Sequence, residues 1–328
     1  MRADHPAERG AALLTVLLLV SVISVIAASA LERMRIATRL TANTVAIDQA
    51  RNYAIGAEAL TVTRINALLA RNSGRVTLAG GWSGRPFSLV VPGGVIRATI
   101  TDRDNCFNLN GLVSRLGPDR LAARPASMAQ FARLMRLIGI NDQVARTVAA
   151  STADWIDSDD DQQPLGAEDS QYNGRVSGYR TGATLMGDPS ELRAVSGVTA
   201  EVYAKLKPWI CALPIAKPAR INVNTILPEQ APLFAMLFPD SLDIGRAHAL
   251  LLERPAQGFT STNEFWRLPA RNGITPDGDA EGQIAVTSQW FALKVEVELG
   301  GASLNETALI DARTNSARLV SRAWGDEA

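Results

Sequence analysis

Histidine, cysteine and aromatic residues are all scarce in this chain of 328 residues. It contains two histidines, His5 and His248, and two cysteines, Cys106 and Cys211, which are not in a CxxC arrangement. A cysteine pair without CxxC spacing and without a histidine nearby makes a poor metal site. The chain also has no Walker, GxSxG or HExxH motif. We therefore expect that this protein is not an enzyme and has no catalytic residues.

A surplus of charge of either sign is also missing. The 33 Lys and Arg residues balance the 33 Asp and Glu residues, so the formal net charge is zero. Proteins that bind nucleic acid usually show a basic face or a high isoelectric point, and we therefore expect no nucleic-acid partner. The length is enough for one large or two medium domains, each with a hydrophobic core.

Charged residues are missing altogether from one segment near the N-terminus, Ala11 to Leu31. Its length is about that of a helix that crosses the hydrocarbon core of a membrane, and its residues are apolar all round such a helix. A polar leader, residues 1–10, precedes it and ends at Gly10. Ala28-Ser29-Ala30 leaves open an alternative, a secretory signal peptide that is cut after the apolar segment.

Proline is missing from Leu31 to Arg85, and apolar residues in the first part of this stretch recur at helical spacing. The apolar segment is therefore predicted to continue as one amphipathic helix to about Arg71, which Asn72-Ser73-Gly74 would end. Such a helix would be roughly 90 Å long.

A leader that ends in Gly directly before such a helix resembles the precursors of type IV pilins and type II secretion pseudopilins. The resemblance implies that a prepilin peptidase cleaves between Gly10 and Ala11 and methylates the new amine of Ala11. It also implies a single-pass anchor in the inner membrane, with the N-terminus in the cytoplasm and the head domain in the periplasm. Most of these proteins have Glu as the fifth mature residue, where this chain has Thr15. In the family that Glu neutralises the amine of the subunit ahead, so Thr15 indicates a subunit at the tip.

The segments that follow predict an α+β fold. Extended patterns at residues 86–91 and 95–101 predict a β-hairpin, and those at 284–299, 302–313 and 318–324 predict further strands. Between them the pattern is helical, with helices expected at 128–138, 142–156, 201–206, 230–238 and 247–254. We therefore predict a pilin-like domain, residues 32–104 and 283–328, whose small antiparallel sheet is interrupted by an all-helical insertion, residues 105–282.

Four motifs narrow the resemblance: CFNLN at 106–110, DWIDSD at 154–159, GAED at 166–169 followed by Tyr172 and Tyr179, and INVNT at 221–225. With Thr15 and the insertion, they resemble the general secretion pathway protein K (GspK) family, the large minor pseudopilins of type II secretion. The family implies a pseudopilus tip complex with minor pseudopilins I and J, contact with other pseudopilins, and export of folded proteins. The alternative is a minor pilin of a type IV or competence pilus whose helix-hairpin-helix units, which two stretches of the insertion resemble, bind DNA.

The acidic loop that begins at Asp157 has the spacing of oxygen ligands in a calcium site. Short Asp residues alternate and a later Glu is able to bind with both oxygens, although Gln162 stands where an EF-hand loop requires Gly. Because the resembled family also binds calcium in its helical domain, we expect one or two structural Ca²⁺ ions. The expected ligands are Asp157, Asp159, Asp161, Glu168 and Asp169. A solvated acidic loop without an ion is the alternative.

The two cysteines are far apart in the sequence. If the head lies in the periplasm, where oxidation is maintained, Cys106 and Cys211 are expected to form a disulfide. Two buried free thiols are the alternative.

Overall fold

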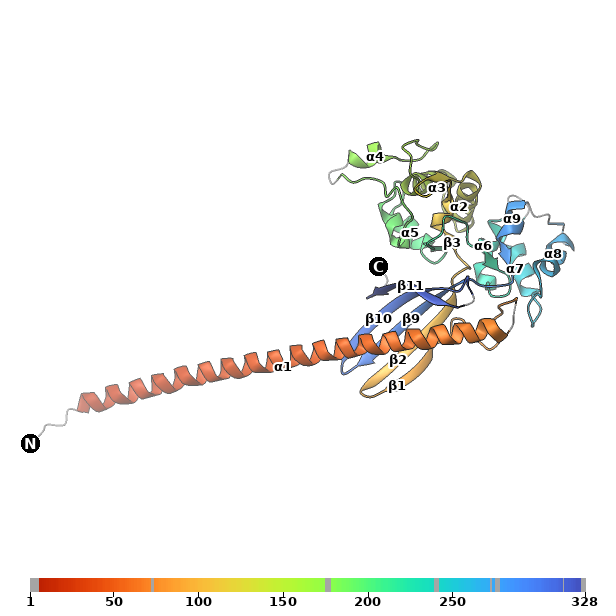
Figure 1. Cartoon of the computed structure of the whole chain (residues 1–328). Coiled ribbons are helices and arrows are strands. Elements are labelled where there is room, and N and C mark those ends of the chain that lie inside the picture. Colours follow the sequence, from red (N-terminus) through yellow and green to blue (C-terminus); the bar gives the residue numbers. More distant parts are fainter. Residues whose placement is uncertain are drawn as a thin grey trace, which may run out of the picture.

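The computed structural model describes residues 6–71, 74–174, 178–238, 242–271, 273–274, 278–314 and 316–325. A single long helix carries a β-sheet along its C-terminal half, and a helical body lies beyond one end of that sheet (Figure 1). The N-terminal half of the helix projects away from the rest of the described chain.

The long helix, α1 (Pro6–Arg71), confirms the predicted continuous helix and its end at Arg71. Asn72 and Ser73, which were expected to end it, lie outside the described residues, and Gly74 has a positive φ of 101°. An 18-residue window within Ala11–Arg71 reaches a mean hydropathy of 2.8, and none of that window is buried by the protein. This part of α1 is long and apolar enough to cross a membrane.

The sheet is antiparallel with the order β1-β2-β9-β10-β11. Its strands are β1 (Phe87–Val91), β2 (Gly94–Asp102), β9 (Trp290–Leu299), β10 (Ala302–Asp311) and β11 (Arg318–Trp324). The predicted hairpin is therefore confirmed, and the chain leaves the sheet after β2 and returns to it in β9. In this register Ala98 lies opposite Val295, although the whole insertion separates them in the sequence.

The predicted strand at 284–299 was too long. Only β8 (Ile284–Ala285) forms at its start, and it pairs in parallel with β7 (Ile221–Asn222) of the insertion instead of joining the large sheet. Between β8 and β9 the backbone turns, because the Ser288 hydroxyl donates to Asp102 and the Gln289 amide donates to Asp104.

Buried alanine residues allow α1 to pack closely against the sheet. Ala50, Ala54 and Ala57 are almost fully buried on one face of α1, together with Ile65. They share a hydrophobic core with buried side chains of the sheet, such as Phe291. Small side chains at this spacing lie on one helix face and let the helix backbone approach the strands.

A pair of buried carboxylates lies in this contact. Glu58 of α1 and Glu306 of β10 are both within the core, and Arg322 of β11 forms an ion pair with Glu58 and lies 3.6 Å from Glu306. Burial, together with the neighbouring carboxyl group of Glu58, raises the pKa of Glu306 to about 8. One arginine therefore faces two carboxyl groups, and Glu306 is the one that retains a proton at neutral pH.

Replacing Glu306 by Gln is expected to stabilise the fold at pH 8 by on the order of 2–4 kcal/mol. The carboxyl group ionises near pH 4.5 in the unfolded chain and near pH 8 in the native state. The native state thus binds more protons between these values, and its stability falls as the pH rises. Urea unfolding of Glu306→Gln and of wild type at pH 5 and pH 8 measures the effect. Glu298→Gln, an exposed substitution on β9, is the matched control. Equal pH dependence in wild type and Glu306→Gln would contradict the assignment.

The insertion is predominantly helical, as predicted. Its helices are α2 (Pro125–Leu137), α3 (Asp142–Ile156), α4 (Asp169–Asn173), α5 (Ala200–Leu206), α6 (Ala231–Ala235), α7 (Ile244–Leu252), α8 (Thr262–Arg271) and α9 (Gly278–Gln283). Short 3-10 turns, η1 (Leu109–Leu112), η2 (Pro189–Ala194) and η3 (Pro228–Gln230), link them. Three small strand pairs occur as well: β3 (Phe107–Asn108) with β6 (Ile210–Cys211), β4 (Val113–Arg115) with β5 (Leu121–Ala123), and β7 with β8.

The predicted helix at 230–238 is shorter than expected, since regular α-helix is limited to α6. The helix expected at 247–254 begins earlier, because Asp243 caps α7 by accepting a hydrogen bond from the Arg246 amide. At the centre of the insertion, the rings of Phe107 and Phe131 stack with their centroids 4.5 Å apart.

Candidate functional site

The expected processing segment lies at the start of α1. Gly10 and Ala11 are both within the helix, in the part that projects beyond the head. Thr15 donates its hydroxyl to the carbonyl of Ala12 at 2.9 Å. The threonine side chain is therefore satisfied by its own helix and requires no partner from another subunit.

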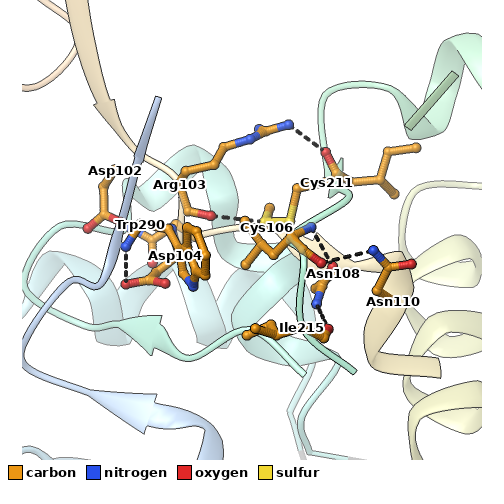
Figure 2. The surroundings of a disulfide bond; sticks show 12 residues. Asp102, Arg103, Asp104, Cys106, Asn108, Asn110, Cys211, Ile215 and Trp290 are labelled. Atoms are coloured by element: carbon orange, nitrogen blue, oxygen red, sulfur yellow. Dashed lines mark hydrogen bonds between the residues drawn. A yellow bond between two sulfur atoms is a disulfide. The ribbon is translucent and has the colours of Figure 1, made fainter. Parts of the chain in front are cut away.

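The disulfide between Cys106 and Cys211 is formed, with the two Cα atoms 5.9 Å apart. Both residues are buried: Cys106 directly precedes β3, and Cys211 is the last residue of β6, which pairs in parallel with β3 (Figure 2). This confirms the predicted bond and excludes the alternative of two free thiols. The bond joins the beginning of the insertion to the segment that leads into its second half.

The asparagines of the CFNLN motif fasten distant segments to each other. Asn108 donates to the carbonyls of Ile215 and Lys217 and accepts from the Leu213 amide (Figure 2). Asn110 bonds in the same way to Met186 and Leu213. Since both side chains are buried, these bonds satisfy backbone groups that have no access to water.

The INVNT motif holds the second half of the insertion to the sheet. Asn222 donates to the Val76 carbonyl and to Ser288, and Asn224 exchanges hydrogen bonds with the backbone of Phe259. The hydroxyl of Thr225 donates to Asp102 at the end of β2. Both motifs therefore have a structural role.

The acidic loop follows α3, and two of its five predicted ligands are buried without partners. Asp157 is 1% exposed and Glu168 is 6% exposed. None of their four carboxylate oxygens accepts a hydrogen bond from the described residues. A buried carboxylate without a partner carries a large desolvation cost, which a bound cation would remove.

The pKa values of Asp157 and Glu168 are raised by the same burial and by nearby carboxylates. Burial, followed by the charges of Asp159 and Asp154, raises the pKa of Asp157 to about 8. Burial likewise raises the pKa of Glu168 to about 7, with Asp154 as the next cause. The carboxylates of the loop therefore repel each other within a poorly hydrated space.

Asp154 is a member of this cluster that our ligand prediction missed. It is fully buried in the last turn of α3 and accepts a hydrogen bond from the Gln163 amide at 3.2 Å. The loop closes on it so tightly that a Cβ added to Gly166 would lie 1.9 Å from its carboxylate oxygen. Asp154 lies in α3 and Asp157 directly follows the helix, so the two meet only because the loop folds back onto the helix end.

The other three predicted ligands are less enclosed. Asp159 is half-buried and accepts from the Asp161 amide at 3.1 Å, while Asp161 is exposed. Asp169 instead accepts from the amide and the hydroxyl of Thr181. Over the described residues, no three carboxylate, imidazole or thiol side chains are gathered closely enough to form a finished metal site. The orphaned oxygens of Asp157 and Glu168 nevertheless fit the hard oxygen ligands that calcium takes.

A cluster of three aromatic side chains packs next to the acidic loop. Trp155 contacts Tyr172 and Tyr179 with ring centroids 5.4 and 6.0 Å apart. The hydroxyl of Tyr172 accepts from the Ser196 amide, and that of Tyr179 donates to the Ala194 carbonyl. The two tyrosines after GAED therefore tie the loop to the segment around η2.

The stretches that resemble helix-hairpin-helix units contain glycine turns, but the arginine beside the second turn forms hydrogen bonds within the protein. Gly197 and Gly258 have positive φ angles of 83° and 70°. Arg254, which precedes the second turn, donates to the carbonyls of Val223 and Ile226. Its guanidinium is thus engaged in holding the INVNT segment and is not directed to a phosphate.

Comparison with known proteins assigns the family. Family models described as "Type II secretion system (T2SS), protein K" match residues 105–215 and 221–287. The type II secretion system protein K of Klebsiella pneumoniae is 36% identical over 320 residues, which cover 97% of each chain. The chain belongs to the type II secretion system protein K family. The protein K of Pectobacterium carotovorum subsp. carotovorum is 33% identical, with the same coverage of 97% for each chain.

A solved member of the protein K family has the same fold. The crystal structure of the GspK-GspI-GspJ complex from enterotoxigenic Escherichia coli matches with a TM-score of 0.74 and 29% identity, over 85% of this chain and 97% of that chain. The two matched family segments correspond to the two halves of the insertion. The first contains the disulfide and the acidic loop, and the second begins with the INVNT motif.

Proposed function

We propose that this chain is the minor pseudopilin at the tip of a type II secretion pseudopilus, where it supports the export of folded proteins across the outer membrane. The observation that carries the proposal is full-length similarity to protein K, combined with a helix that is apolar at one end and carries a head at the other. The N-terminal half of α1 anchors the precursor in the inner membrane with its N-terminus in the cytoplasm, and the head lies in the periplasm.

The partners we propose are the smaller minor pseudopilins I and J, followed by the other pseudopilins of the fibre. The related crystal structure is a complex of GspK with GspI and GspJ, and this chain has the same fold. The tip position has two supports in this chain. Thr15 has no charge with which to neutralise the amine of a subunit ahead, and the helical body lies beyond the end of α1 that is farthest from the membrane anchor.

The acidic loop is proposed to bind one or two structural Ca²⁺ ions. Asp157 and Glu168 would supply the buried carboxylate oxygens. Asp154, Asp159 and Asp161, whose charges act on Asp157, would be drawn in by the ion to complete the shell. A bound ion would supply positive charge where these carboxylates repel each other. The protein's own contribution is to bring the end of α3 and the start of α4 together around that charge.

Processing is expected to depend on Gly10. We predict that Gly10→Val blocks prepilin-peptidase cleavage, because the side chain occupies the position next to the cut bond, and that uncleaved precursor accumulates. Mass spectrometry of purified membranes should show mature wild type that begins at N-methylated Ala11, and precursor for Gly10→Val. Ala7→Val, a change elsewhere in the leader, is the control and should still be processed. Mature protein that begins at Leu31 would instead support signal-peptide cleavage after Ala30.

Deletion of the gene tests the function as a whole. Loss of secretion of folded proteins into the medium, with twitching motility and DNA uptake unaffected, is the expected result. The reverse pattern would favour a minor pilin of a type IV or competence pilus. Complementation by the intact gene controls for effects on neighbouring genes.

A further inference from the structure

A cavity of about 630 Å³ opens where the insertion meets the sheet. Trp290 at the start of β9 and Arg313 just after β10 contribute the sheet side, and the segment from Pro214 to Arg220 contributes the insertion side. Its volume is in the range of pockets that bind drug-sized ligands, roughly 300–1,000 Å³. Neither the membrane anchor nor the acidic loop contributes to it.

Positive charge is concentrated in this cavity. Five cationic side chains line it against the single carboxylate of Asp104, in a chain whose charges balance overall: Arg115, Arg124, Lys217, Arg220 and Arg313. Asp104 faces inward, where it accepts hydrogen bonds from the amides of Gln289 and Trp290. Burial raises the pKa of Asp104 well above its usual range, which weakens its opposing charge.

Two of the five cations have no direct partner among the described residues, although the charge of Arg220 also acts on Asp104 and lowers its pKa. Lys217 and Arg220 are both exposed, and in the part of the chain that the structure describes their side chains form no hydrogen bond or ion pair. Arg313, in contrast, pairs with Asp311 at 2.9 Å, and Arg115 donates to the Pro118 carbonyl. A cleft with unpaired cations on a low-dielectric wall attracts and concentrates anions.

The wall of the cavity places a second requirement on a ligand. Trp290 is 1% exposed, and its indole nitrogen has no acceptor among the described residues. The Arg313 guanidinium stacks over its ring at 4.6 Å, and Ile215 lies beside it close to the disulfide (Figure 2). A matching ligand therefore offers an apolar group to this wall.

We propose that this cavity binds a carboxylate-bearing peptide segment of another protein. The carboxylate lies between Lys217 and Arg220, where charge-assisted hydrogen bonds hold it, and a neighbouring apolar side chain packs against Ile215 and Trp290. A lipid headgroup does not suit the site, because the cavity is at the opposite end of the molecule from the apolar half of α1. The proposal stands independently of the tip assignment.

Calorimetric titration of the full chain in detergent micelles tests the site. The probe is N-acetyl-glycyl-leucine with a free C-terminal carboxylate, compared with the same peptide as its C-terminal amide and with inorganic phosphate. We expect the acid to bind with a dissociation constant below about 1 mM, and the amide to bind at least about tenfold more weakly. Binding of amide and acid with equal affinity, phosphate binding as tightly as the peptide acid, or no binding of the acid would each overturn the proposal.

Variants test whether the peptide acid binds at Lys217 and Arg220. Lys217→Gln combined with Arg220→Gln should weaken binding of the acid by on the order of tenfold, because both charge-assisted bonds are lost. Both residues are exposed, so the melting temperature should not change. Lys205→Gln on α5 removes an exposed lysine outside the cavity and should bind like wild type. The indole N–H resonance assigned by Trp290→Phe should move on addition of the acid. A double variant with wild-type affinity, or an unmoved Trp290 resonance, would contradict the assignment.

Discussion

Chelation of calcium is expected to lower the melting temperature of the head by roughly 5–10 °C. A ligand present at about a hundred times its dissociation constant stabilises the folded state by about 2.7 kcal/mol, and in a domain of this size each kcal/mol corresponds to about 2–4 °C. Without the ion, Asp157 and Glu168 remain buried with no hydrogen-bond partner among the described residues. Melting curves of the full chain in detergent, with calcium, with magnesium and with EDTA, measure the shift.

The Asp157→Asn variant makes this prediction more specific. It should no longer respond to calcium, and in EDTA it should melt at a higher temperature than wild type. The reason for the second effect is that the substitution removes a buried carboxylate that neighbouring carboxylates repel. Asp119→Asn, an exposed substitution outside the loop, is the matched control and should keep the full calcium response. Wild-type protein that melts at the same temperature in calcium and in EDTA would rule out the proposed site.

Loss of the disulfide is expected to destabilise the fold by about 4–5 kcal/mol, the chain-entropy value for a loop of about a hundred residues. The bond links residues 105 positions apart, so its removal frees a long loop in the unfolded chain. The double variant Cys106→Ala plus Cys211→Ala should show this loss in urea unfolding. The position of the bond adds to the effect, since it lies against Leu213, Ala219 and Trp290 in a small buried cluster.

Reduction of the wild type separates the covalent contribution from the packing contribution. Reduced wild type retains both sulfur atoms, so it should lose most of the stability that the double variant loses. Any further loss in the variant measures the space left in the buried cluster. Under the proposed function, export should fall in parallel, because unfolded protein is degraded. Equal stability of oxidised and reduced wild type would show that the bond has no role in stabilising the head.

Local pattern was enough to predict the parts of this protein whose structure depends on neighbours in sequence. The long helix ends at Arg71 and α3 spans Asp142–Ile156, both as predicted, since helical spacing of apolar side chains is a property of a short window. The hairpin of β1 and β2 was found for the same reason. The disulfide was predicted from the expected periplasmic location of the head, and not from the spacing of the two cysteines.

The structural features that the sequence did not reveal depend on contacts between distant segments. The residues at 286–289 carry a strand-like pattern but turn instead, because Ser288 bonds to Asp102 at the end of β2 and Gln289 bonds to Asp104 just after it. Asp154 enters the acidic cluster because the loop folds back onto α3, which no spacing rule in the loop itself shows.

The sequence by itself therefore determined the anchor, the order of the elements and the interruption of the sheet. Only the tertiary structure decided which side chains share a space. The basic cavity is the clearest case, because Arg115, Lys217, Trp290 and Arg313 are far apart along the chain and belong to no common motif. The physical reason is that periodicity reports which face of an element is buried, while a site arises where faces of different elements meet.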